Sequence, residues 1–109
     1  VAAEPARFTA ADRLQEVPTA HSAALVTRLT EDADALAAFL ARLGETGTAR
    51  DLTDGLRLTL ASGRVVHLRP SGNAPELRFY AEAETPAAAA ALLAAGLDRL
   101  RETLPGDAV

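Results

Sequence analysis

The stretch LRLTLASGRVVHLRPSGNAPELRFYAEA, residues 56–83, predicts strands on both sides of two short connections. Its leucines at 56, 58 and 60 alternate with Arg57 and Thr59, which is the period-two pattern of a strand with one apolar face. Ala61-Ser62-Gly63 favours a tight turn, and residues 64–69 form the returning strand. We therefore expect a β-hairpin that ends at Arg69.

A third strand follows the loop from Pro70 to Pro75. In it Leu77, Phe79 and Ala81 alternate with Arg78, Tyr80 and Glu82. Proline, serine, glycine and asparagine are common turn residues, so the pattern alone is also compatible with a plain connecting loop.

Helical periodicity flanks these strands. A short helix is expected from Pro18, capped by Thr19 or Ser22, and a second from Thr30, which precedes two acidic residues and caps a run that ends at Gly44. Residues 49–51 suggest a short strand. Thr85, followed by proline at the first helical position, begins an alanine-rich helix ended by Pro105-Gly106.

The sum predicts an α+β fold, a two-layer sandwich. An antiparallel sheet of about four strands is covered on one face by two amphipathic helices, and the other face and the loop end stay free. Residues 1–17 lack a sustained period and are interpreted as a linker or lead-in from a preceding domain, in which Arg13, Gln15 and Val17 can form a short edge strand. Residues 18–109 form the domain.

Composition excludes several classes of function. The chain has 109 residues and a net charge of −4, which argues against general binding to nucleic acid or to an anionic membrane. It has no cysteine, so disulfides, thiolate metal sites and cysteine catalysis are excluded. No apolar run reaches the roughly 20 residues that span a bilayer, and the start is not a signal peptide. A cytoplasmic domain is expected.

The loop carries the side chains best suited to a ligand. Arg69 and Arg78 offer planar guanidinium groups, which bind phosphate in a bidentate manner. Ser71 and Asn73 are short and polar, and Gly72 lets backbone amides approach an anion. All eleven basic residues are arginine, so arginine by itself indicates nothing here. The placement beside Ser71, Gly72 and Asn73 predicts a phosphate-binding loop.

The run Arg-Pro-Ser-Gly-Asn-Ala-Pro, residues 69–75, resembles the C-terminal signature of the α-D-phosphohexomutases, the phosphomannomutase/phosphoglucomutase family. The usual family form is Arg-Pro-Ser-Gly-Thr-Glu-Pro. Asn73 and Ala74 depart from it, although an asparagine amide can still donate to a phosphate oxygen. The hairpin before the loop and the strand and helix after it also match.

The resemblance implies a TATA-binding-protein-like fold and a role as the fourth, C-terminal domain of a four-domain enzyme. It implies that Arg69, Ser71, Gly72 and Asn73 contact the substrate phosphate, with Arg78 in support. The whole enzyme would interconvert hexose 6-phosphate and hexose 1-phosphate, with mannose or glucose as the sugar. The preceding domains of the enzyme are then partners of this one.

The family's catalytic phosphoserine loop and its aspartate-rich magnesium loop have no counterpart in this sequence. We therefore expect no catalytic residue, metal or cofactor in this part of the chain, and Mg²⁺ only in the full-length enzyme. Asp51 and Asp54 lack metal-loop spacing, and His67 is interpreted as an exposed strand histidine. Two alternatives stay open: a phosphoglucosamine mutase domain, or a freestanding module that binds phosphate or a protein without catalysis.

Overall fold

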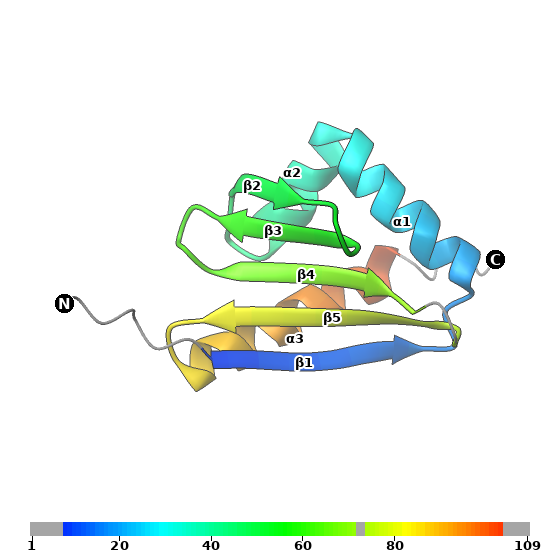
Figure 1. Ribbon diagram of the computed structural model, residues 1–109. Coiled ribbons are helices and arrows are strands. Elements are labelled where there is room, and N and C mark those ends of the chain that lie inside the picture. The colour runs from blue at the N-terminus through cyan, green and yellow to red at the C-terminus, as the bar shows by residue number, and fades with distance from the viewer. Residues whose placement is uncertain (1–7, 72–73, 104–109) are drawn as a thin grey trace.

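The computed structural model describes residues 8–71 and 74–103, which form a five-stranded sheet and three helices (Figure 1). In chain order the elements are β1 (Phe8–Gln15), α1 (Thr19–Glu31), α2 (Ala33–Arg42), β2 (Gly47–Asp51), β3 (Leu56–Leu60), β4 (Val65–Pro70), β5 (Glu76–Ala83) and α3 (Pro86–Thr103).

The strands form one antiparallel sheet in the order β1-β5-β4-β3-β2. The three central strands are those predicted from residues 56–83, and β2 confirms the short strand expected at 49–51. In the register, Leu58 pairs with Val66, which pairs with Ala81. The apolar residues of neighbouring strands therefore share one face of the sheet.

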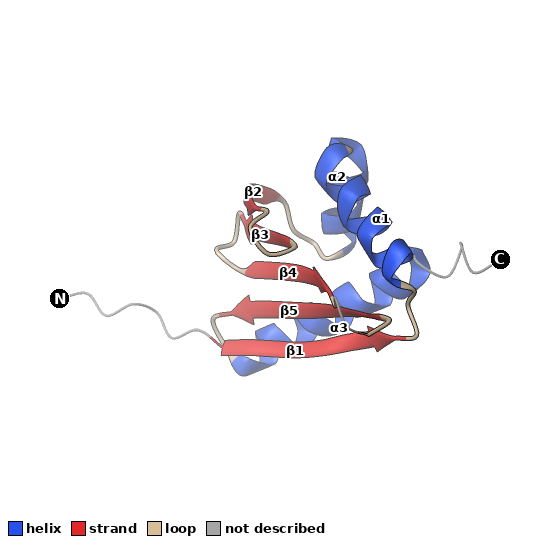
Figure 2. Ribbon diagram, turned by 45° about the vertical axis from the view of Figure 1, so that its right-hand side comes forward, coloured by secondary structure: helices blue, strands red, loops and turns tan. Residues whose placement is uncertain are grey.

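The helices cover that apolar face (Figure 2). The core between the layers is aliphatic apart from two phenylalanines, as the low aromatic content requires. Leu56, Leu68, Leu77 and Phe79 are fully buried within it. In β3, β4 and β5 the opposite sheet face carries the polar members of the strand. This arrangement confirms the predicted α+β two-layer sandwich.

The sheet has one strand more than the four expected, because residues 8–15 of the predicted lead-in form β1. This strand pairs with β5 along its whole length, from Phe8 with Ala83 to Gln15 with Glu76. Leu14 is buried, and Val17 N donates to Pro75 O at 2.8 Å just after the strand. The edge strand suggested for residues 13–17 therefore exists, but it begins earlier and ends at Gln15.

The predicted helix caps near residue 30 were wrong in position. Thr30 lies inside α1, where its hydroxyl donates to Val26 O at 2.7 Å. The cap of α2 is Asp32, whose carboxylate accepts from Asp34 N at 3.0 Å and from Ala35 N at 3.1 Å. Aspartate and threonine are both common N-cap residues, so the sequence alone does not decide between Thr30 and Asp32 as the cap of α2.

At the start of α1 the two suggested caps were also wrong. Pro18 is the N-cap and makes no side-chain bond, Thr19 is the first helical residue, and Ser22 is buried within the helix. By contrast, the cap of α3 is confirmed, because the Thr85 hydroxyl accepts from Ala88 N at 3.0 Å. The predicted stop at Pro105-Gly106 lies outside the described residues.

Candidate functional site

Backbone hydrogen bonds close the base of the loop between β4 and β5. Ser71 N donates to Glu76 O at 3.1 Å, and Glu76 N donates to Ala74 O at 2.8 Å. The Ser71 hydroxyl accepts from Ala74 N at 3.2 Å. Gly72 and Asn73, two of the five predicted site residues, lie outside the described residues. Ser71 thus lies at the start of a short loop whose base is closed by hydrogen bonds.

Arg69 lies at the end of β4 beside the turn that joins β2 to β3. Its Nε is 3.1 Å from a carboxylate oxygen of Asp54. Gly55 has a φ of 81°, and a Cβ there would lie 2.3 Å from Leu68 O, so only glycine lets the turn lie against β4. Both partners of the ion pair are exposed, and such pairs contribute about 0–1 kcal/mol. The ion pair between Arg69 and Asp54 therefore contributes little to the stability of the fold.

The sheet register aligns three arginines on the open face next to the loop. Arg69 on β4 pairs with Arg78 on β5, which in turn pairs with Arg13 on β1. Like charges directly opposite each other destabilise a sheet unless something compensates them. Of the three, Arg13 was not predicted as a site residue. The sequence indicates nothing more about Arg13 than its position in a possible edge strand.

Glu76 compensates two of these charges. One carboxylate oxygen lies 3.2 Å from Arg13 Nε, and the other lies 3.4 Å from Arg78 Nε. Hydrogen bonding to Tyr80, and then to Glu76, raises the pKa of Arg78 above its ordinary value. All three arginines of the row are cationic at neutral pH, and they share the acids Asp54 and Glu76.

A hollow of about 250 Å³ opens over β1 and β5. Its lining consists of Ala11, Asp12, Arg13, Arg78 and Tyr80. Two of these five residues are arginines from the row, so the hollow is a cationic continuation of the surface beside the loop.

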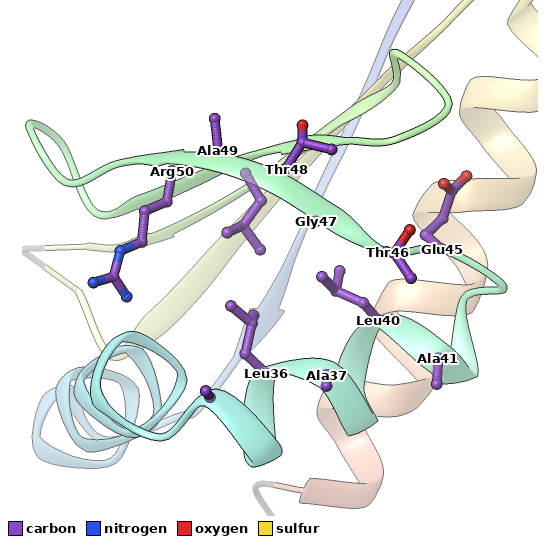
Figure 3. A pocket seen from close by; sticks show the side chains of 12 residues that line it. Leu36, Ala37, Leu40, Ala41, Glu45, Thr46, Gly47, Thr48, Ala49 and Arg50 are labelled. Atoms are coloured by element: carbon purple, nitrogen blue, oxygen red, sulfur yellow. The ribbon is translucent and has the colours of Figure 1, made fainter.

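A larger groove of about 690 Å³ lies at the other edge of the sheet, between α2 and β2 (Figure 3). Leu36 and Leu40 of α2 point toward β2 in this view. Among the described lining residues Arg50 alone is basic, and its guanidinium donates to Thr30 O. The groove is therefore mainly apolar and does not match the chemistry of a phosphate.

His67 and the two aspartates near it are engaged in structural contacts. The ring of His67 bonds to Asp54 O and lies 5.6 Å from the ring of Tyr80, centroid to centroid. Hydrogen bonds from the side chain and backbone of Thr53 lower the pKa of Asp51. In the part of the chain that the structure describes, no three His, Cys, Asp or Glu residues are placed to hold a metal ion. Asp51, Asp54 and His67 therefore do not fit a magnesium site.

The structure is an α+β domain with a row of exposed arginines next to the loop between β4 and β5, and comparison with known proteins places it more closely. The family model described as "Phosphoglucomutase/phosphomannomutase, C-terminal domain" matches residues 16–100. A phosphomannomutase from Sinorhizobium fredii is 45% identical over 92 residues, which cover 84% of this chain and 19% of the relative. A phosphomannomutase from Salmonella muenchen is 38% identical over 104 residues, 92% of this chain and 21% of the relative.

The chain belongs to the phosphoglucomutase/phosphomannomutase family and corresponds to its C-terminal domain. It spans about a fifth of the length of these two relatives. Within residues 8–71 and 74–103, no helix is both long and apolar enough to cross a membrane.

Proposed function

We propose that this chain is the part of a phosphomannomutase or phosphoglucomutase that holds the phosphate of a hexose phosphate. Arg69, Ser71, Gly72 and Asn73 contact the phosphate, and Arg78 supports them from the neighbouring strand. The observation that carries the proposal is the position of Arg69. It lies at the base of the loop and is exposed, and its ion-pair partner among the described residues is the exposed Asp54, which an anion can displace.

Binding exchanges one counter-ion for another. In the free domain Asp54 neutralises Arg69, and Glu76 neutralises Arg78. A phosphate at the loop accepts charge-assisted hydrogen bonds from the Arg69 guanidinium, which are stronger than neutral ones. Because the closed loop already holds Ser71 at its entrance, little ordering is needed on that side of the site.

The whole enzyme interconverts hexose 6-phosphate and hexose 1-phosphate in this proposal, as a cytoplasmic isomerase. The phosphoryl-transfer residues and the Mg²⁺ ion belong to other parts of the enzyme, which are also this domain's partners. By itself the 109-residue chain is inactive. In this proposal the residues of the site contact the phosphate and not the sugar. The phosphates of mannose, glucose and glucosamine should therefore bind the isolated domain with similar affinity.

The first prediction concerns Arg69. We expect mannose 6-phosphate to shift the backbone amide signals of residues 69–76 in an NMR titration of the 109-residue chain. Arg69→Ala should weaken this binding about tenfold or more, because hydrogen bonds to a charged group are lost. In the full-length enzyme the same change should lower kcat/KM by at least a similar factor.

Arg101→Ala is the matched control. It removes the same charge from the exposed surface of α3, where Arg101 pairs with Asp98 at 3.1 Å, and should leave the affinity within twofold of the unchanged domain. Amide shifts that avoid residues 69–76, or an equal loss in both variants, would contradict a phosphate site at the loop.

A further inference from the structure

We infer that Arg13 and Arg78 form a second anion subsite on the open face of the sheet, which takes a phosphate monoester in the hollow lined by these arginines and Tyr80. This subsite is additional to the loop site around Arg69 and Ser71. It depends on β1, a strand that lies before the residues matched by the family model.

The register places the two guanidinium groups side by side. Arg13 and Arg78 are direct partners in the β1–β5 ladder, and adjacent strands lie about 4.8 Å apart. Both are about half exposed, so a ligand can reach them from solvent. Two guanidinium groups at this spacing can each donate hydrogen bonds to the same phosphate.

The contacts of Arg13 and Arg78 with Glu76 are compatible with hydrogen bonds from both arginines to a phosphate. Glu76 approaches both arginines through Nε, one carboxylate oxygen to each. Among the described residues, Glu76 is the one acid that forms an ion pair with Arg13. With respect to residues 8–71 and 74–103, the terminal nitrogens of Arg13 therefore remain available, and a single carboxylate compensates two cations.

Asp12 also contributes to the lining of the hollow, although its register partner is the fully buried Phe79 on the covered face of the sheet. Its carboxylate also accepts a hydrogen bond from Arg13 N at 2.7 Å. Tyr80 supplies a wall of the hollow beside Arg78.

The hollow and the loop can be tested separately because Arg69 faces away toward Asp54, whereas Arg13 is two strands away from it. The experiment titrates the 109-residue chain with inorganic phosphate, and then with glucose 6-phosphate, at low ionic strength. Signals of the arginine Nε–H groups and of the backbone amides are followed by NMR. We expect two sets of shifts, one at Arg13 and Tyr80 and one at residues 69–76, with Arg78, which lies between them, responding to both.

Arg13→Ala should weaken binding in the hollow about tenfold and leave the loop shifts unchanged. Arg69→Ala should do the reverse, so a failure at the loop is distinguishable from a failure in the hollow. Arg13→Gln serves as a second variant if the alanine variant is less well folded.

Glu76→Gln gives a readout that a purely structural role would not. Removing the shared negative charge about 4 Å from the bound anion should strengthen phosphate binding in the hollow about fivefold. The subsite is overturned if Arg13→Ala leaves all phosphate shifts unchanged, or if sodium chloride at equal ionic strength produces the same shifts in the hollow.

Discussion

Gly96 lies where α3 passes the aromatic ring of Phe79. A Cβ at this position would approach two atoms of that ring to 2.3 Å. Phe79 is fully buried, so its ring has no free space to move into. The glycine inside a helix therefore has a packing reason, since it lets α3 come close to β5.

At this residue two effects oppose each other. Alanine is favoured over glycine in a helix by about 1 kcal/mol, whereas overpacking a core costs about 1–3 kcal/mol. We expect the steric cost to prevail, so Gly96→Ala should lower the free energy of unfolding by about 1 kcal/mol or more in urea denaturation. Ala94→Gly, on the exposed side of α3, reports helix propensity alone. A more stable Gly96→Ala variant would contradict the close contact.

Single residues of the site could be predicted to different degrees. The order of residues 69–73 indicates a phosphate loop because the relevant side chains are neighbours in sequence. The Asp54-Gly55 turn is visible in the sequence, but the ion pair of Asp54 with Arg69 is not. Arg13 could not be assigned, because only the sheet register brings it to Arg78.

At the scale of elements, Asp32 separates α1 from α2 and caps the second helix. Replacing it with alanine leaves the amides of Asp34 and Ala35 without this acceptor. Asp32→Ala should therefore destabilise the domain by about 1 kcal/mol, measured by thermal or urea unfolding. Asp32→Asn should retain most of the stability.

Asp34→Ala is the control for this cap, since it removes a neighbouring charge from the first turn of α2. We expect it to cost only a few tenths of a kcal/mol through the helix dipole. Equal losses for Asp32→Ala and Asp34→Ala would mean that charge, and not the cap, is responsible.

Strands differ in how clearly the sequence reports them, for a physical reason. In β3 and β5 alternate side chains are buried, so hydrophobic residues recur with period two. In β1 only Leu14 is buried among eight residues, because the strand lies at an edge of the sheet. Such a strand is held mainly by backbone hydrogen bonds, which leave no pattern in the side chains.

For the molecule as a whole, the structure makes β1 part of the folded unit. Leu14→Ala should then lower the free energy of unfolding by about 2 kcal/mol, because a buried leucine is truncated. Phe8→Ala, at the exposed start of the same strand, should cost less than about 1 kcal/mol. If Leu14→Ala has no effect, β1 is not integral to the fold.

The pairing of the first strand with the last has a consequence for the order of folding. Gln15 pairs with Glu76 and Phe8 with Ala83, so every pair in this ladder joins residues more than 60 positions apart. At about 5–20 residues per second, β1 leaves the ribosome roughly 3–12 seconds before β5. During that time β1 cannot pair with β5, its neighbour in the sheet. Its polar and charged residues, such as Asp12 and Arg13, disfavour wrong pairing while it waits.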